Sequence, residues 1–199
     1  MMATQKLLVT GFEPFDTRGY NTSAEVLELL PDNIDGHPIV THVLPVSWNR
    51  IERSLRETLE RVRPTIHIGL GMSKADHLGL ERIAVNFRGI DRRDAEGLTP
   101  DNEELAPDAP LALRSSIPFE QISRRLGRDY PHRLSGSAGD YLCNAVMFFS
   151  HWVAQTSSHL SAFVHVPPKP ADGGWTVRQT AEAITIISST LLETATRVA

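Results

Sequence analysis

The chain has 199 residues and a formal net charge of −4, with 41% hydrophobic and 22% charged residues. This is the composition of one soluble globular domain, which we expect to span residues 1–199. No basic run would attract a nucleic acid, and no apolar stretch is long enough for a membrane span. One cysteine excludes an internal disulfide, and with no secretion signal in view we expect a cytoplasmic protein.

Short apolar runs alternate along the chain with stretches whose apolar residues recur at spacings of three and four. This alternation predicts strands separated by amphipathic helices. In chain order, we expect a strand over 6–10, a helix over 23–30, a strand over 37–46, a helix over 48–62, strands over 65–70 and 82–87, helices over 119–127 and 140–152, a strand over 161–166 and a helix over 176–196. Residues 89–118 are rich in Asp, Pro and Gly and predict a long loop, which in a compact domain is often a functional lid.

The ends of the first two helices carry their own signals. Ser23 and Ser47 stand where a side-chain oxygen can cap the backbone N–H groups of a helix start. Pro31 and Pro64 follow the two helical patterns, and proline cannot continue a helix. We therefore expect Ser23 and Ser47 to be N-caps.

The order strand, helix, strand, helix is typical of an α/β domain with a largely parallel sheet that helices cover on both faces. In such sheets, ligands bind beyond the carboxyl ends of the strands. This rule indicates three segments as parts of a site, namely residues 11–15, 69–81 and 165–168.

Cys143 lies about one turn into the helix that we expect to begin near Asp140. Unpaired N–H groups and the dipole at a helix N-terminus favour a thiolate, the nucleophilic form of cysteine. The preceding Gly-Ser-Ala-Gly offers little side-chain cover, so a substrate carbonyl can approach. The alternative is a small core residue packed beside Val146 and Met147, because free cysteine is often simply buried.

His165 stands at the end of a strongly apolar strand, where sites form in α/β domains. An imidazole beside a cysteine can hold the thiolate and then protonate a leaving amine. The alternative is a structural histidine bonded to a backbone carbonyl. We expect the other histidines to have no such role, with His151 and His159 at a helix surface or in a loop. No paired-histidine spacing is present, so we expect no metal site.

Glu81 stands between two apolar runs, at the expected start of the strand over 82–87. A carboxylate in that setting needs a partner, and His165 can supply it while being oriented by it. The alternative is a solvated charge paired with Arg82, because exposed glutamate is the norm.

Four segments, in this order, resemble the pyroglutamyl peptidase I family, the pyrrolidone carboxyl peptidases, and the resemblance extends from about Leu7 to the last helix. These segments are TGFEPFDTRGYNTS (10–23), LERIAVN (80–86), SAGDYLCNAVMF (137–148) and SAFVHVPP (161–168). The resemblance implies a single three-layer α/β/α sandwich of the phosphorylase/hydrolase type, with a mixed, largely parallel sheet.

The resemblance also implies a function and the roles of three residues. Cys143 would be the nucleophile, His165 the acid and base, and Glu81 the orienting carboxylate. Such an enzyme is a thiol protease that removes an N-terminal pyroglutamyl group from peptides through a thioester, without a cofactor. Its partners would be small peptides with a blocked N-terminus and other copies of the chain, in a dimer or a tetramer.

The substrate pocket follows from the same resemblance. Phe12 and Phe15 would form apolar walls for a small flat ring, and Asn21 would order the loop that carries them. Arg92 or Arg93 would stand in for the arginine that the family places after its glutamate, where it assists the oxyanion. The residues themselves do not decide between these two arginines.

The chain departs from the family at two places in this pocket. Asp16 and Thr17 stand where the family has Gly-Gly. Leu70 and Gly71 stand where many bacterial members carry a glutamine that reads the lactam, and we count Leu70 among the expected substrate contacts. An apolar contact discriminates weakly between ligands. Two other functions therefore stay open: a Cys-His-Glu amidase for another small N-acyl or lactam substrate, and a non-catalytic homologue that binds such a ligand.

Overall fold

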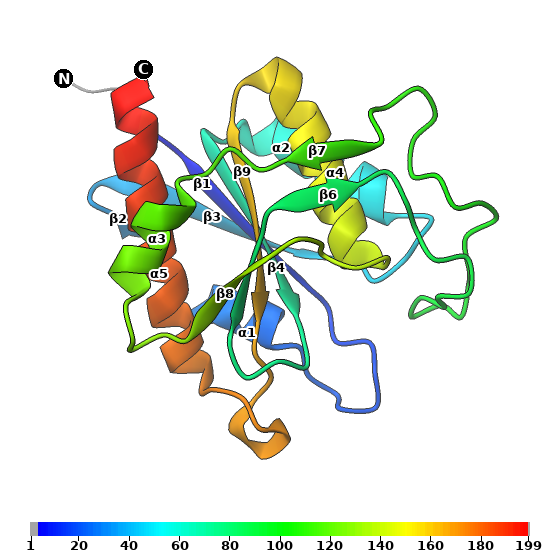
Figure 1. Ribbon diagram of the computed structural model, residues 1–199, viewed down its shortest axis with the longest axis horizontal. Coiled ribbons are helices and arrows are strands. Elements are labelled where there is room, and N and C mark those ends of the chain that lie inside the picture. The colour runs from blue at the N-terminus through cyan, green and yellow to red at the C-terminus, as the bar shows by residue number, and fades with distance from the viewer. Residues whose placement is uncertain (1–3, 199) are drawn as a thin grey trace.

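A seven-stranded sheet runs through the centre of the molecule, and helices cover both of its faces (Figure 1). The structure is a computed structural model that describes residues 4–198. Its strands are β1 (Leu7–Phe12), β2 (Asn33–Ile34), β3 (His37–Leu44), β4 (Ile66–Met72), β5 (Leu78–Glu81), β6 (Ile83–Val85), β7 (Ala112–Arg114), β8 (His132–Ser135) and β9 (Leu160–Val166). Its helices are α1 (Thr22–Leu29), α2 (Ile51–Val62), α3 (Phe119–Leu126), α4 (Leu142–Ser157) and α5 (Val177–Val198), with a short 3₁₀ turn at Pro170–Asp172.

The sheet has the strand order β2-β3-β1-β4-β9-β5-β8. Strands β3, β1, β4 and β9 run parallel, so their carboxyl ends meet at one edge. Strand β5 runs antiparallel to β9, and β2 antiparallel to β3. Strand β1 is buried along its whole length, and β4 up to its last residue, as expected for strands that helices cover on both faces. The prediction of an α/β fold with a mixed, largely parallel sheet is confirmed.

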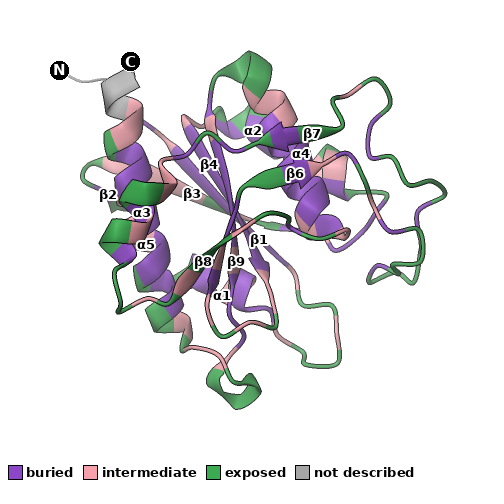
Figure 2. Cartoon of the chain, viewed as in Figure 1, coloured by how far each residue is buried: buried purple, intermediate pink, exposed green. Residues whose placement is uncertain are grey.

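Two apolar clusters separate the sheet from its helices. One cluster lies between the sheet and α1, α3 and α5, and includes Val26, Ile122 and Ile187. The other lies between the sheet and α2 and α4, and includes Leu55 and Phe148. Figure 2 shows the same division, because the helix surfaces toward the sheet are buried and the outer surfaces are exposed. The predicted three-layer sandwich is confirmed.

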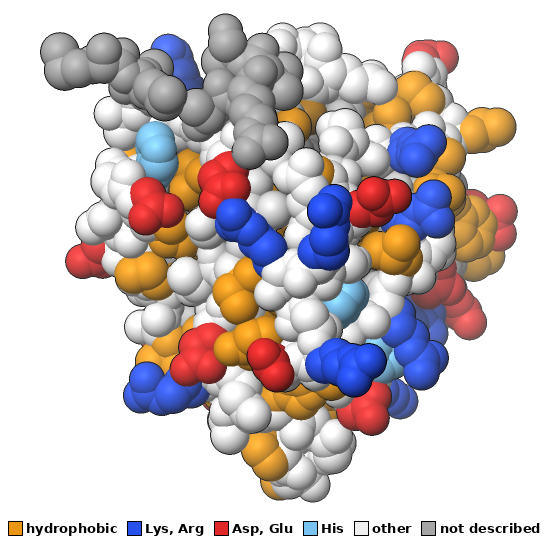
Figure 3. Space-filling view, turned by 60° about the vertical axis from the view of Figure 1, so that its left-hand side comes forward, with side chains coloured by type: hydrophobic (Ala, Val, Ile, Leu, Met, Phe, Trp, Pro, Cys, Tyr) orange, Lys and Arg blue, Asp and Glu red, His pale blue; other side chains and the backbone are white. Residues whose placement is uncertain are grey.

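The side of the molecule with α3 and α5 carries acidic, basic and apolar side chains interspersed, with no gathering of one sign (Figure 3). Arg125 of α3 and Glu193 of α5, for example, form an ion pair of 2.5 Å. In the part of the chain that the structure describes, no helix is both long and apolar enough to cross a membrane.

The prediction that residues 82–87 form a strand of the main sheet is wrong. Residues 78–81 form β5 there, and residues 83–85 form β6, which pairs antiparallel with β7 in a separate two-stranded sheet. The backbone of Arg82 lies at the junction, because its N–H donates to Ser135 and its carbonyl accepts from Ser115. Glu81 therefore ends a strand and does not start one. The two short apolar runs on either side of Glu81 and Arg82 do not by themselves reveal this change of sheet.

Both predicted N-caps are wrong by a few residues. The N-cap of α1 is Asn21, whose Oδ1 accepts from the N–H of Ser23 at 3.1 Å. The Ser23 hydroxyl instead donates to Asn21 and accepts from the N–H of Phe12. Helix α2 begins at Ile51, and it is the carbonyl of Ser47, not its hydroxyl, that accepts from the N–H of Ile51.

The prediction that His151 lies at a helix surface is wrong, because this residue of α4 is buried. His159 lies in the loop between α4 and β9, as predicted, but it is buried too. Desolvation lowers the pKa of each to about 4. The imidazole of His151 contacts the carbonyl of Met147 at 2.8 Å and the hydroxyl of Ser161 at 3.0 Å. His67 lies nearby, fully buried and bonded to Ser150. Short polar side chains between α4 and the sheet thus accommodate neutral histidines.

Residues 86–111 form the excursion between β6 and β7 and contain no helix or strand. Asn86, at the start of this segment, bonds to the backbone of its returning part. Its Oδ1 accepts from the N–H groups of Leu105 at 3.0 Å and Ala106 at 2.9 Å, and its Nδ2 donates to the carbonyl of Ala106 at 2.8 Å. Asn86 is buried, so water does not readily replace these bonds.

We predict that Asn86→Ala lowers the free energy of unfolding by about 2 kcal/mol, because it leaves buried backbone groups without partners. Urea denaturation measures this loss. Asn102→Ala is the matched control: its side chain also bonds within the excursion but is exposed. We expect a loss of at most about 0.5 kcal/mol for this control. Equal losses in the two variants would contradict the role of Asn86.

Candidate active site

Three side chains from separate elements come together at the edge where the parallel strands end. Cys143 is the second residue of α4, His165 is near the end of β9, and Glu81 is the last residue of β5. The Nδ1 of His165 donates to Glu81 Oε1 at 2.7 Å. Glu81 is only 3% exposed, so its carboxylate is oriented inside the protein.

The pKa of His165 reflects this setting. Burial would lower it, but the hydrogen bond and charge of Cys143, followed by those of Glu81, outweigh burial and raise the pKa to about 10. An imidazole with a negative group on each side stays protonated at neutral pH. The geometry therefore favours an imidazolium held between Glu81 and Cys143.

Gly79 makes the contact between His165 and Glu81 possible. It pairs with His165 in the antiparallel β5–β9 register, so a side chain here would share the face of the sheet with both residues. A Cβ at Gly79 would lie 3.0 Å from Glu81 Oε1 and 3.2 Å from the Cβ of His165. Sequence reasoning missed Gly79, although a glycine two residues before a candidate catalytic glutamate is a visible signal.

Two glycines on β4 make room for Cys143 in the same way. A Cβ at Gly71 would lie 2.7 Å from Cys143 Sγ, and one at Gly69 would lie 2.7 Å from the ring of Phe163. Phe163 also packs edge-to-face against His165, with ring centroids 5.3 Å apart. The thiol therefore lies over a glycine-lined strip of β4, beside the aromatic ring that supports its histidine.

The start of α4 is fastened to the segment that follows Glu81. Asn144 is fully buried, and its Oδ1 accepts from the N–H of Val85 at 3.0 Å. Its Nδ2 donates to the carbonyls of Val85 and Phe87, each at 2.8 Å. The three bonds hold α4, the helix of Cys143, to β6 and the residues after it; β6 begins two residues after Glu81. Sequence reasoning missed this residue, and its position directly after Cys143 was the available signal.

The predicted wall residues differ in exposure. Phe15 is 43% exposed, and its ring lies 5.9 Å from that of Tyr141, two residues before Cys143. Trp48 packs edge-to-face on the same tyrosine at 5.4 Å. Phe12 is only 4% exposed and packs in the core under α2 and α4. Phe15, Tyr141 and Trp48 thus form an aromatic group beside the start of the helix that carries Cys143, and the sequence indicated only the first of them.

The prediction that Leu70 contacts substrate is corrected by its position. Leu70 is fully buried and belongs to the apolar cluster that α1 and α5 cover. Successive side chains of a strand point to opposite faces. Leu70 therefore points away from the face on which Gly69 and Gly71 adjoin Phe163 and Cys143.

The two candidate arginines have different surroundings. The Nε of Arg92 lies 3.5 Å from Asp140, and its guanidinium lies 5.7 Å from the ring centroid of Tyr141. The guanidinium of Arg93 instead donates to the carbonyl of Gly97 at 3.4 Å. Arg92 is thus the arginine whose side chain lies beside the residues that precede Cys143.

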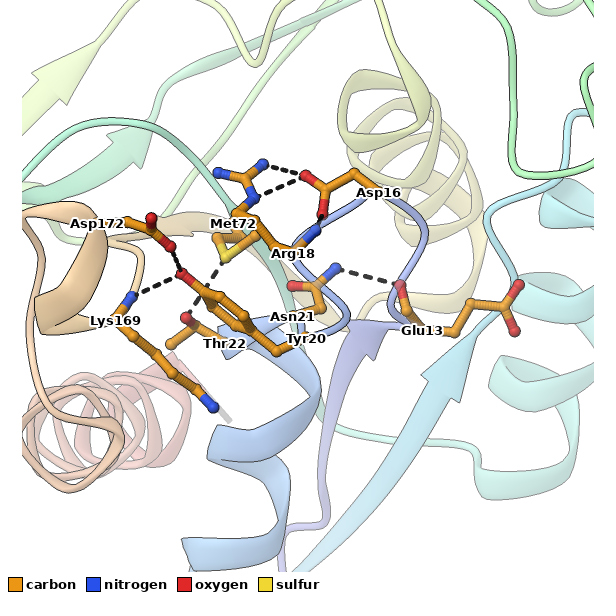
Figure 4. Close-up of polar contacts among 9 residues, drawn as sticks. All are labelled: Glu13, Asp16, Arg18, Tyr20, Asn21, Thr22, Met72, Lys169 and Asp172. Carbon is orange, nitrogen blue, oxygen red and sulfur yellow. Dashed lines mark hydrogen bonds and ion pairs between the residues drawn. The ribbon is translucent and has the colours of Figure 1, made fainter.

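Asn21 lies at the end of the segment that carries Phe15 (Figure 4). Besides capping α1, its Nδ2 donates to the carbonyl of Glu13 at 3.3 Å, which closes the segment at its base. Gly11 allows this closure, because a Cβ there would lie 2.3 Å from the carbonyl oxygen of Ser23. Among the described residues, no group of three or more His, Cys, Asp or Glu side chains could hold a metal ion.

Residues 5–190 match the sequence profile of the pyroglutamyl peptidase family. The chain belongs to this family. It is 38% identical over 173 residues to the pyrrolidone-carboxylate peptidase of Pyrococcus furiosus, covering 83% of this chain and 82% of that relative. The solved pyrrolidone carboxyl peptidase from Thermococcus litoralis superposes with a TM-score of 0.89 at 31% identity, over 96% of this chain and 94% of that one. The solved pyrrolidone carboxyl peptidase from Thermus thermophilus superposes with a TM-score of 0.85 at 33% identity, over 92% of this chain and 99% of that one.

We predict that Gly71→Ala slows alkylation of Cys143 by iodoacetamide by about tenfold, because the new methyl group turns the thiol away from His165. Mass spectrometry of the alkylated peptide gives the rate. Gly136→Ala is the control, because a Cβ at Gly136 meets nothing within 4 Å. Equal alkylation rates in the two variants would count against the position assigned to the thiol.

Proposed function

We propose that the chain hydrolyses the amide bond after an N-terminal pyroglutamyl residue, with Cys143, His165 and Glu81 as its catalytic residues. The observation that supports this most is the arrangement of His165, which Glu81 orients through one ring nitrogen and which Cys143 influences strongly enough to raise its pKa to about 10. Membership of the pyroglutamyl peptidase family supplies the substrate.

In the proposed first step, the Cys143 thiolate attacks the carbonyl carbon of the scissile amide and a carbon–sulfur bond forms. The carbonyl electrons move onto the oxygen, which needs preorganised donors. The N–H groups in the first turn of α4 have no partner within the helix and can serve, with Arg92 close to the same turn. His165 then gives its proton to the leaving amine as the carbon–nitrogen bond breaks.

The second step returns the enzyme to its starting state. His165, now neutral, takes a proton from water, and the resulting hydroxide adds to the thioester carbon. The carbon–sulfur bond breaks, which releases pyroglutamic acid and leaves the thiolate beside the imidazolium. Glu81 keeps its place throughout and stabilises the imidazolium.

The aromatic group of Phe15, Tyr141 and Trp48 suits a small flat ring, because such ligands bind between apolar walls. Leu70 is not available as a wall, and Gly71 presents no side chain where many relatives have a polar reader of the lactam. We propose that ring shape contributes more to selectivity here than a side-chain hydrogen bond does.

The relatives' names favour this function over the two alternatives. They are called pyrrolidone-carboxylate peptidases, and nothing among them speaks for an amidase of another substrate or for a non-catalytic binding protein. We also propose cytoplasmic location, from the single cysteine, and assembly as a dimer or tetramer, from the family resemblance. Small peptides with a blocked N-terminus are the proposed partners.

We predict that the wild-type protein releases a fluorophore from a pyroglutamyl amide and that Cys143→Ser loses this activity by at least about a thousandfold, because a serine hydroxyl is a far weaker nucleophile in this setting. Prolyl and alanyl amides are the matched substrates. Cleavage of these amides alone would favour the amidase, and thiol-independent or absent turnover on every amide would contradict a cysteine peptidase.

We predict that Glu81→Gln moves the alkaline limb of kcat/KM to lower pH and lowers its maximum by about 10²- to 10⁴-fold. His165 has a raised pKa, so its proton is present below about pH 10 and lost above it. Without the Glu81 charge, that loss begins at a lower pH. A profile measured between pH 6 and 11 with an unchanged alkaline limb would contradict the proposed role of Glu81.

A further inference from the structure

The segment between β1 and α1, residues 13–21, carries Phe15 and is bonded locally at its base. The N–H of Glu13 donates to the carbonyl of Leu44 at 3.1 Å, and its carboxylate accepts from the N–H of Val46 at 3.0 Å. Within the segment, Asp16 and Arg18 form an ion pair. These contacts fix its base and its tip, but they do not connect it to the strand that carries His165.

Tyr20 makes that connection (Figure 4). Its hydroxyl donates to Asp172 Oδ2 and accepts from the backbone N–H of Lys169 at 3.2 Å. The Lys169 ammonium lies 4.5 Å from the centroid of the Tyr20 ring and forms an ion pair of 2.7 Å with Glu25 of α1. We call Tyr20, Lys169 and Asp172 the Tyr20 clasp.

The far side of the clasp is a rigid turn directly after β9. The N–H of Asp172 donates to the carbonyl of Lys169 at 2.9 Å, and the N–H of Trp175 donates to the carbonyl of Pro168 at 2.9 Å. The Trp175 indole donates to the carbonyl of Asp76 at 2.8 Å. Pro167 and Pro168 follow β9 directly and restrict the backbone between the strand and this turn. The position of Lys169 is therefore set relative to His165, which lies four residues earlier.

We infer that Tyr20 is a positioning residue of the pyroglutamyl site, which holds the segment with Phe15 at a fixed place relative to the strand with His165. The inference rests on the proposed function. Tyr20 bonds neither Cys143 nor Glu81 nor His165 in the described structure. Its effect should therefore fall on binding of the ring and not on the chemical steps.

The hydroxyl keeps its proton under working conditions. Burial first, and the hydrogen bond to Asp172 second, raise the pKa of Tyr20 above its usual value. The clasp is therefore closed at neutral pH, and a phenylalanine at this position removes its hydrogen bonds while keeping the ring under Lys169.

The kinetic test compares Tyr20→Phe with Tyr130→Phe. Tyr130 is the matched control, because its hydroxyl also donates to an exposed carboxylate, that of Glu182, at 3.1 Å. This bond connects the segment before β8 to α5 and does not involve residues 13–21. We expect Tyr20→Phe to raise KM for a pyroglutamyl amide about three- to tenfold with kcat within about twofold, as one hydrogen bond to a charged group allows. Equal KM values for the two variants, or a fall in kcat alone, would overturn the inference.

A rescue separates positioning from general damage. Asp172→Ala should raise KM as Tyr20→Phe does, whereas Asp172→Asn should stay near wild type, because an amide oxygen still accepts from the Tyr20 hydroxyl. The double variant Tyr20→Phe with Asp172→Ala should be no worse than either single change. If the double variant raised KM by the product of the two single fold-increases, the two residues would act independently, and the clasp would be overturned.

A second measurement needs no turnover. Arg18 lies in the exposed tip of the segment, so trypsin cleavage after Arg18 reports how often the segment opens. We expect faster release of fragment 1–18 from Tyr20→Phe and Asp172→Ala, but not from Asp172→Asn or Tyr130→Phe. An unchanged rate would overturn the clasp. If wild-type protein cleaves no pyroglutamyl amide, the proposed function fails and with it the role in binding, while this rate still decides whether Tyr20 holds the segment.

Discussion

The hydrogen bond between His165 and Glu81 is the contact on which the candidate active site depends. It joins β5 and β9, two neighbouring strands that run antiparallel, and so it depends on the reversal of direction beside the four parallel strands β3, β1, β4 and β9. The second oxygen of Glu81 is buried and has no hydrogen-bond partner among the described residues. A buried carboxylate with so little other compensation is stabilised chiefly by a charged imidazole.

Glycine residues, which have no side chain, leave the space for this arrangement. Gly69 and Gly71 on β4 and Gly79 on β5 lie on the two strands that flank β9, and a methyl group at any of them would meet Phe163, Cys143 or Glu81 at 3.0 Å or less. Helix α4, which carries Cys143, can approach the sheet closely only over such a surface. The fold supplies the edge where strands end, and the glycines decide which side chains can meet there.

Much of the fold and the three central residues could be predicted from the sequence, because strand and helix periods differ and because Cys143 and His165 stand at element ends. Other features depend on tertiary contacts. In the run LGLERIAVN, Glu81 and Arg82 separate two short apolar stretches, and this pattern does not reveal that the chain changes sheets at Arg82. Leu70 is a plausible wall until its face of the strand is known. His151 looks polar in sequence, yet nearby hydroxyls let the core accept it. Asn21 and Ser23 are both good caps, and only the backbone decides between them.

The way in which the excursion is attached to the fold has a consequence for how the sequence of this enzyme can diverge. Residues 86–111 leave and re-enter the fold through one narrow base, where β6 pairs with β7 and Asn86 bonds to the returning backbone. Asn144 secures the outgoing strand from the helix side. Arg92 and Arg93 lie beside Asp140 and Tyr141, so the first part of this segment is tied to the candidate site. Length changes farther along the segment place little load on Cys143, His165 and Glu81, since loop closure costs grow slowly with length. That farther part is accordingly the region in which evolution, or an engineer, can exchange whole stretches of chain while the arrangement of these three residues stays intact.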